Sequence, residues 1–290
     1  MGKRKNDVDL ENRKARIKNR MTTALIYLEL VVVSLIVLLP VTWIVGSSFN
    51  HTSSLATSSI IPKNPTLDHY IALFQETDFL KWYGNTLKIA VGNMLASVVV
   101  TTLTAYVFSR FRFKGRKGGL MTILVLQMFP SFLGMTAIYI LYLNFNLLDN
   151  LGALTVTYIA GQIPYNTWLM KGYFDGIPQS LDEAAMLDGA SRLRIFYQII
   201  MPLAVPMITF LAVTTFMSPW MDYIFPRLLI SSDKNKTLAV GLFEMINGNT
   251  NNNFTMFAAG AVMVAVPITI LYMCLQKYLI QGITAGANKE

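Results

Sequence analysis

The apolar stretch TTALIYLELVVVSLIVLLPVTWIVG, residues 22–46, decides the fold class of this chain. A run of about 20 apolar residues is enough for an α-helix to cross the hydrocarbon core of a bilayer. The stretch carries a single charged residue, Glu29, is longer than the core of a signal peptide and lacks a small-residue cleavage site. It therefore predicts a first membrane-spanning helix that stays in the mature protein.

The composition of the whole chain agrees with a membrane location. Of its 290 residues, 53% are hydrophobic and 14% are charged, and the mean hydropathy is +0.46. A soluble domain carries about 25% charged residues, so this chain has too few charges for an ordinary water-facing surface. The single cysteine, Cys274, excludes an internal disulfide and a thiolate metal site.

Five further apolar runs predict helices that cross the membrane, which makes six spans and an all-α membrane protein. They lie at residues 84–109, 120–143, 152–170, 203–224 and 256–276. Segments 1–20, 110–119, 171–202 and 277–290 hold 18 of the 24 lysines and arginines. Because cytoplasmic segments of membrane proteins are enriched in these residues, both termini are predicted to be cytoplasmic. The same bias explains the net charge of +8 without nucleic-acid binding, for which the sequence has no motif.

These segments predict the organisation of the chain. Residues 1–21 form a basic cytoplasmic tail, residues 22–46 the first transmembrane helix and residues 47–83 an extracytoplasmic loop. Residues 84–276 form a five-helix core that includes a cytoplasmic loop at 176–202, and residues 277–290 form a cytoplasmic tail. The outside segment 225–255 is also rich in residues that favour turns. Prolines 40, 130, 164, 219 and 267 fall in or near the spans and predict bent helices.

The cytoplasmic loop contains the most informative stretch, GIPQSLDEAAMLDGAS, residues 176–191. Ser180 has Glu183 three residues later, which is the spacing of a capping box and predicts a short helix from Leu181 to Leu187. Gly189 predicts its end, because glycine takes the left-handed conformation without a steric penalty. Ser191 is expected to cap a second short helix. One interpretation is an amphipathic segment in the membrane interface; the small side chains around Ala184 favour packing against another protein.

The spacing in this stretch resembles the EAA loop of ABC importer permeases. The matching residues are Glu183, Ala184, Ala185, Asp188, Gly189, Ala190, Phe196, Ile199 and Pro202. The resemblance implies a type I ABC importer permease bundle, in which the short helix couples the permease to an ATPase. Carried over by position, the coupling residues are Glu183, Ala184, Ala185, Asp188 and Gly189.

The C-terminal segment resembles the tail of MalG-type maltose and maltodextrin permeases. The resemblance rests on QKYL at residues 276–279 and on Gly282, Thr284 and Gly286. It implies that the last three of these contact the ATPase; the alternative is a frayed terminus, as is usual for chain ends. By position, the loop at 241–253 resembles the outside loop that engages a sugar-binding protein in this family.

The MalG-type resemblance implies a permease subunit that forms half of the path for maltose or maltodextrins across a bacterial inner membrane. The implied partners are two cytoplasmic ATPase subunits that hold ATP-Mg, a second homologous permease, an extracytoplasmic sugar-binding protein and membrane lipid. One alternative is another cargo, such as a different oligosaccharide or a glycerol phosphate. The other is a stand-alone secondary carrier, which would need intramembrane acidic residues, and the spans offer only Glu29 and Asp222.

The motifs that the chain lacks indicate a transport subunit and not an enzyme. There is no phosphate-binding Gly-x-x-x-x-Gly-Lys-Ser/Thr loop, so the chain itself is expected to hold no ATP or other cofactor. His51 and His69 are isolated, and no metal site is expected. Polar residues within the spans either line a path or form interhelical hydrogen bonds, and the sequence leaves the substrate-binding residues unassigned. These polar residues are Asn93, Gln127, Gln162 and Asn166.

Overall fold

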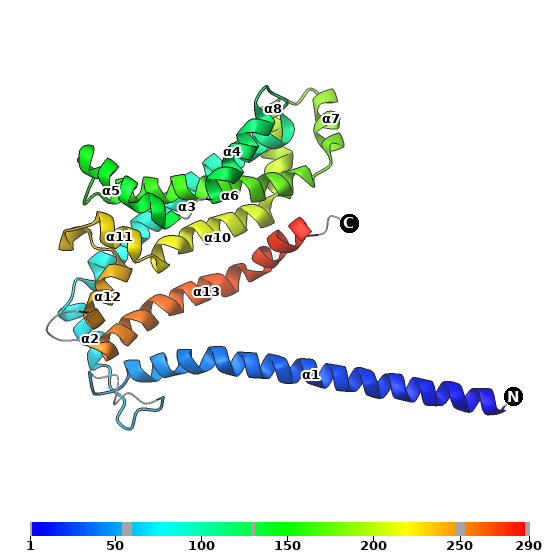
Figure 1. The fold of residues 1–290 in the computed structure, drawn as a ribbon, viewed down its shortest axis with the longest axis horizontal. Coiled ribbons are helices and arrows are strands. Elements are labelled where there is room, and N and C mark those ends of the chain that lie inside the picture. Colours follow the sequence, from blue (N-terminus) through cyan, green and yellow to red (C-terminus); the bar gives the residue numbers. More distant parts are fainter. Residues whose placement is uncertain (1, 54–59, 129–130, 248–252, 288–290) are drawn as a thin grey trace.

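The computed structural model describes the backbone of residues 2–53, 60–128, 131–247 and 253–287, and the side chains of residues 19–53, 60–128, 132–247 and 253–280. This part of the chain is helical and contains no strand, which confirms the all-α prediction (Figure 1). The helices are α1 (Gly2–Ser48), α2 (Asp68–Gln75), α3 (Phe79–Arg110), α4 (Arg116–Met128), α5 (Met135–Asn144), α6 (Leu151–Asp175), α7 (Gln179–Leu187), α8 (Arg192–Ile195), α9 (Met201–Leu203), α10 (Val205–Met221), α11 (Ile224–Leu229), α12 (Leu238–Asn247) and α13 (Phe254–Ala287).

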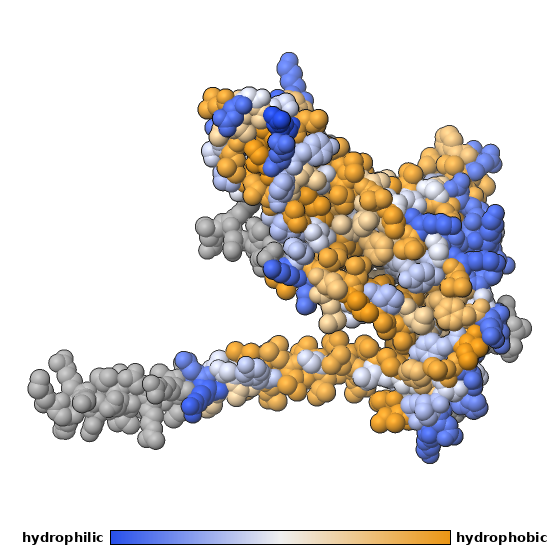
Figure 2. Space-filling view, turned by 180° about the vertical axis from the view of Figure 1, so that it is seen from behind, coloured by the Kyte–Doolittle hydropathy of each residue, from blue (hydrophilic) through white to orange (hydrophobic). Residues whose placement is uncertain are grey.

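Helix α1 stands apart from the rest of the molecule and approaches it only near Ser48, beside α2 and the start of α13 (Figure 1). There the rings of Trp43 and Phe254 lie 5.5 Å apart, and the hydroxyls of Ser48 and Tyr70 are 2.8 Å apart. The side chains from Met21 to Val41 are exposed, and Figure 2 shows them as an apolar band. Because such a surface is stable in lipid and not in water, the band agrees with the predicted first span.

The remaining helices form a bundle in which α3 packs against α6 and α10, and α13 packs against α10. Helix α3 begins at Phe79, earlier than the predicted residue 84. Phe79 and Trp82 are both buried in a cluster with Leu238 and Leu242 of α12, and this burial accounts for the earlier start. The close approach of α12 requires Gly241, since a Cβ atom there would lie 2.3 Å from the Trp82 ring.

The predicted span 120–143 is a broken helix, because α4 and α5 are separated by a 3-10 turn at Ser131–Gly134 and the pair is bent by 86°. A bend was expected in this span. Pro130 lies in this break by sequence, and proline has no N–H to continue a helix. The segment Arg192–Leu203 makes an angle of 79° with α10.

Each of the six predicted apolar runs is mostly helical within the residues that the structure describes. Segments Asn19–Ser48, Phe79–Arg110 and Phe254–Ile280 are long and apolar enough to cross a membrane as single helices. If each bent pair that contains α5 or α10 is counted as one span, the number of such spans rises to five. Helix α6 corresponds to the predicted run 152–170 and has 25 residues, but it is not among the helices that reach this level of hydropathy.

Asp149 joins the turn before α6 to the segment between α11 and α12. Its Oδ1 atom accepts hydrogen bonds from the N–H groups of Ser231 and Ser232, at 3.1 and 2.9 Å. The Asn235 amide donates to the Asp149 carbonyl at 2.7 Å and to its Oδ2 at 3.1 Å. Burial alone would raise the pKa of Asp149, but the hydrogen bonds from Ser232, Ser231 and Asn235 outweigh it and lower that pKa below its ordinary value.

Replacing Asp149 by asparagine is expected to lower the melting temperature at neutral pH, because a neutral amide accepts these hydrogen bonds less strongly than a carboxylate does. Because the pKa of Asp149 is lowered in the folded state, the carboxylate contributes fully to the free energy of unfolding when the pH is above the ordinary pKa of 3.8. This contribution is lost as the pH falls through the lower pKa of the folded state. The difference in melting temperature between wild type and variant should therefore shrink below about pH 4. A difference that stays constant as the solution is acidified would contradict this assignment.

Candidate functional site

Helix α7 starts differently from the prediction. Its first residue is Gln179 and its N-terminal flanking residue is Pro178, with φ −56° and ψ 130°, so the predicted cap at Ser180 is wrong. The reason is local geometry. Proline fixes φ near the value that a chain entering a helix needs, and the Pro178 carbonyl accepts the Leu181 N–H at 3.3 Å. Ser180 and Glu183 therefore lie inside the helix, and neither caps its start.

The end of α7 agrees with the prediction for Gly189, which has a φ of +81°. The Gly189 N–H donates to the Met186 carbonyl at 3.0 Å, and the Ala190 N–H donates to the Ala185 carbonyl at 2.9 Å. This pair of bonds is the Schellman motif, which satisfies carbonyl groups that a helix end leaves open. The motif turns the chain sharply at Gly189 toward α8.

Ser191 caps α8 as predicted, since its hydroxyl accepts the Arg194 N–H at 3.3 Å. The chain then forms a π-helical turn at Phe196–Ile200 and leads through α9 into α10. A π turn places its side chains differently from an α-helix, and such turns are frequent at functional sites. Here the turn directs both Phe196 and Ile200 into the protein interior, where each is at most 2% exposed.

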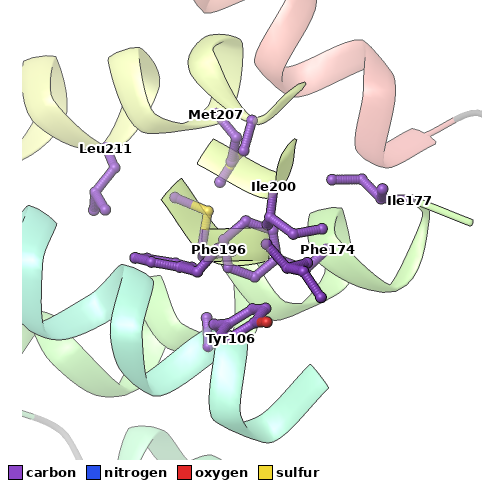
Figure 3. Close-up of a cluster of buried hydrophobic side chains, with 11 residues drawn as sticks. Tyr106, Phe174, Ile177, Phe196, Ile200, Met207 and Leu211 are labelled. Atoms are coloured by element: carbon purple, nitrogen blue, oxygen red, sulfur yellow. The ribbon is translucent and has the colours of Figure 1, made fainter. Parts of the chain in front are cut away.

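A buried apolar cluster supports α8 and the π turn. Figure 3 shows Tyr106 of α3, Phe174 of α6 and Met207 of α10 converging on Phe196 and Ile200. The rings of Tyr106 and Phe196 are 4.8 Å apart, and the Tyr106 hydroxyl donates to the Arg192 carbonyl at 3.2 Å. Three spans therefore contact the segment that follows α7.

A buried ion pair joins α7 to the end of α3. The Arg110 Nε atom lies 2.8 Å from the Asp182 Oδ2 atom, and the two side chains are 2% and 4% exposed. Arg110 also donates through Nη2 to the Ile177 carbonyl at 2.9 Å. Beside this pair, the Ser109 hydroxyl donates to Asp175 at 2.8 Å. The sequence alone does not reveal the pairing of Asp182 with Arg110, because nothing in the local sequence shows that residues so far apart are partners.

The face of α7 that points away from the bundle is exposed. It carries the predicted coupling residues Glu183, Ala184, Asp188 and Gly189, whereas Ala185 is half-buried against the apolar cluster. Leu187, which was not among the predicted coupling residues, is 89% exposed next to them. It adds an apolar side chain to this exposed face, and contiguous exposed apolar groups mark interaction sites.

The other predicted sites lie elsewhere. Gly282, Thr284 and Gly286 belong to the last turns of α13, but their side chains lie outside the described residues. Asn93 is fully buried and donates to the Thr215 carbonyl at 2.7 Å, which is an interhelical hydrogen bond, the second of the two alternatives. Gln162 also makes interhelical hydrogen bonds, since it donates to the Ser218 hydroxyl at 3.0 Å and accepts from the Asn93 amide at 3.4 Å. Gln127, Gln162 and Asn166 line cavities. Within the described residues no group of His, Cys, Asp and Glu side chains is arranged to hold a metal ion.

Comparisons with known proteins identify the family of this chain. Residues 97–285 match the family described as binding-protein-dependent transport system inner membrane component. The galactooligosaccharides transport system permease protein GanQ of Bacillus subtilis is 43% identical over 266 residues, 91% of this chain and 94% of that protein. The maltodextrin transport system permease protein MdxG of the same organism is 42% identical over 275 residues, 95% of this chain and 98% of that protein.

A solved structure of a bacterial ABC transporter involved in the import of the acidic polysaccharide alginate contains a chain with the same fold. It aligns with a TM-score of 0.79 at 24% identity and covers 90% of this chain and 98% of that chain. The matched relatives are transport permeases, so this chain is a transport subunit and not an enzyme. The chain therefore belongs to the binding-protein-dependent inner membrane components, as a multi-pass, MalG-type permease subunit of the ABC importers.

Proposed function

We propose that this chain forms half of the path for maltodextrins in an ATP-driven importer and docks onto a cytoplasmic ATPase through α7. The proposal rests on two features of α7. One face of the helix is exposed, and a buried ion pair joins the helix to α3. The exposed face consists of Glu183, Ala184, Leu187, Asp188 and Gly189. The small side chains allow close approach of a partner. In this proposal the ion pair transmits a movement of α7 to the membrane-spanning helix α3. ATP-Mg is bound by the partner in this proposal.

The proposed orientation places α7, α8 and both termini in the cytoplasm. The observation that supports it is that α7, the start of α1 and the end of α13 lie on the same side of the molecule (Figure 1). The basic segment 110–119 begins at the end of α3 that contacts α7, and cytoplasmic segments are enriched in Lys and Arg. The last turns of α13, with Gly282, Thr284 and Gly286, then lie on the side where an ATPase can contact them.

The remaining partners follow from the same proposal. Two ATPase subunits require two permease chains, so a second homologous permease is expected to cover the exposed apolar surfaces of the bundle. A sugar-binding protein is expected on the opposite side, near α2 and α12, where segment 241–253 lies in part outside the described residues. The similarity to the maltodextrin permease MdxG supports maltodextrins as cargo, and the similarity to GanQ puts galactooligosaccharides in the same test panel.

Replacing Ala184 by arginine is expected to remove the ATPase from the complex, because a long charged side chain prevents close approach at the exposed face of α7. The measurement is co-purification from native membranes through an N-terminal tag, which leaves the C-terminal tail free. We expect the bound ATPase to fall at least about tenfold, which corresponds to about 1.4 kcal/mol of association free energy. The wild-type complex should show ATPase activity that a maltodextrin-loaded binding protein stimulates.

The matched control is Met186→Arg, which adds the same side chain at an exposed position of the same helix. The two positions are two residues apart, so Met186 points about 160° away from Ala184. Retention of the ATPase by Met186→Arg and its loss from Ala184→Arg would support the docking face. If wild type instead purifies alone and still transports sugar, the importer assignment fails and a stand-alone carrier takes its place.

A further inference from the structure

A basic cavity of about 620 Å³ lies where the chain turns from α3 into α4. Its lining includes three cations, two apolar side chains and a glycine, namely Arg112, Arg116, Lys117, Phe113, Leu120 and Gly118. The turn is tight, because Gly115 has a φ of +90° and a Cβ atom added at Gly119 would lie 3.4 Å from the Phe108 ring. The volume falls in the range of about 300–1,000 Å³ that is usual for sites of small ligands.

Two of the cations, Arg112 and Lys117, form no ion pair with another described residue. The surrounding segment 110–119 contains five lysines and arginines and neither Asp nor Glu. Charges of one sign gathered in a cavity raise the local concentration of ions of the opposite sign. The cavity therefore suits an anionic ligand.

Arg116 is the fixed cation of the cavity. Its Nε atom donates to the Phe108 carbonyl at 2.8 Å, and its Nη2 atom donates to the Ser109 carbonyl at 3.3 Å. Both carbonyls lie in the last turn of α3, where the helix dipole stabilises a cation. A guanidinium group has five N–H donors, so Arg116 keeps donors for a ligand after these two bonds are made. Phosphate and carboxylate groups match such a planar set of donors.

An apolar stripe of α4 begins at the cavity. Lys117, Met121 and Val125 are spaced four residues apart and therefore lie along one face of the helix. Met121 is 62% exposed, Val125 is 47% exposed, and no described side chain of α4 is buried. A cation thus stands at the start of an exposed apolar face. This arrangement matches a ligand that has an anionic head and a hydrocarbon chain.

We propose that this cavity binds the phosphate of an anionic phospholipid, whose acyl chain covers Met121 and Val125. The proposal rests on the orientation proposed above, because the negative surface of the cytoplasmic leaflet attracts basic segments. Phosphatidylglycerol has one negative charge and no cation in its headgroup, whereas phosphatidylcholine carries a cation that Arg112 and Lys117 would repel. A free phosphate ion would meet the cations but leave the apolar stripe uncovered, so the occupant is a lipid.

The test is photolabelling of the assembled complex in detergent. The probe is phosphatidylglycerol with a diazirine near the start of one acyl chain, and the labelled peptides are identified by mass spectrometry. Wild type should be labelled in the peptide that contains Leu120 and Met121. Unlabelled phosphatidylglycerol should compete with the probe, whereas phosphatidylcholine and inorganic phosphate should not.

The matched variants are Lys117→Gln and Lys114→Gln, which remove the same charge from exposed positions three residues apart, and of the two only Lys117 lines the cavity. One cation near an anionic lipid strengthens binding about fivefold, so Lys117→Gln should need about fivefold more probe for half-maximal labelling. Adding Arg112→Gln should raise this to at least about tenfold, and Lys114→Gln should stay within about twofold of wild type. Equal losses from Lys117→Gln and Lys114→Gln would show diffuse attraction over the whole segment and would exclude the cavity as a site.

A further pair of variants fills the cavity without changing its charge. A Cβ atom added at Gly118 or at Gly84 would meet no atom within 4 Å, and of the two only Gly118 lines the cavity. Gly118→Phe should reduce labelling at least about fivefold, because the headgroup loses access to the cations, while Gly84→Phe should be labelled like wild type. Undiminished labelling of Gly118→Phe would overturn the site.

The remaining outcomes separate this proposal from the proposed function. Competition by phosphatidylcholine as strong as that by phosphatidylglycerol would refute selection of an anion, and competition by inorganic phosphate would assign the cavity to a soluble ion. Loss of the ATPase from Lys117→Gln would show that Lys117 contacts the ATPase and not lipid. If wild type retains the ATPase but is not labelled, the proposed function stands and the lipid site fails. If wild type is labelled as expected but brings down no ATPase, the lipid site stands and the proposed function fails.

Discussion

Replacing Arg110 by methionine is expected to uncouple ATP hydrolysis from sugar uptake. The substitution keeps a long apolar side chain but leaves the Asp182 carboxylate buried without its partner, since the two side chains are 2% and 4% exposed. Removing one member of a buried ion pair is strongly destabilising, by about 3–5 kcal/mol, because the remaining charge is uncompensated. Arg110 also donates a hydrogen bond to the carbonyl of Ile177, just before α7. The variant loses this hydrogen bond as well.

The expected result is a complex that hydrolyses ATP with less sugar transported per ATP, together with a lower melting temperature. Transport per ATP is the informative quantity, because a loss of stability alone would lower both activities in proportion. The double variant Arg110→Met with Asp182→Leu should recover much of the stability, since an apolar pair can replace a buried ion pair at little cost. A double-mutant cycle over the four proteins then gives the interaction energy of the pair.

The matched control is Arg227→Met, which removes an arginine from an ion pair with Glu244 at 3.0 Å whose side chains are 53% and 33% exposed. Exposed pairs contribute about 0–1 kcal/mol, so this variant should resemble wild type in stability and in transport per ATP. If Arg110→Met behaves as Arg227→Met does, the buried pair does not transmit movement between α7 and α3. Coupling must then pass through the apolar cluster around Phe196.

Replacing Gly189 by valine is expected to prevent ATPase docking. Gly189 has a φ of +81°, and its N–H and that of Ala190 close the Schellman motif at the end of α7. A β-branched residue in this region is strained by about 1–3 kcal/mol, and the chain relieves the strain by unwinding the last turn. That turn carries Leu187 and Asp188, so the proposed docking face is lost with it. The measurement is the amount of ATPase that co-purifies with the tagged permease.

Two controls separate strain from docking. Gly189→Asn should retain the ATPase, because asparagine enters the left-handed region more readily than valine. Gly115 has a φ of +90° and no atom within 4 Å of an added Cβ, so Gly115→Val introduces comparable strain in a segment outside α7. Gly115→Val is expected to be destabilised but to keep the ATPase. Loss of the ATPase from all three variants would show that strain anywhere at this end of the bundle, and not the shape of α7, causes the effect.

The sequence by itself determined the features that depend on short-range chemistry. The apolar run at 22–46 predicts a span because lipid solvates it, whatever its neighbours are. The end of α7 at Gly189 and the cap at Ser191 are confirmed because each depends on hydrogen bonds within a few residues. The positions of the coupling residues come from a local motif in the same way, and their contact with an ATPase stays a prediction.

The tertiary structure decided what depends on packing between distant segments. Helix α3 begins at Phe79, earlier than predicted, because Phe79 and Trp82 are buried against α12. The partnership of Arg110 with Asp182 and the two cavities beside α6 exist only after the bundle assembles. Hydropathy and capping act over a few residues, whereas burial and ion pairing act between segments that the fold brings together. For that reason the sequence predicted the spans and the coupling loop, and the structure alone revealed the ion pair behind the loop and the cavities beside α6.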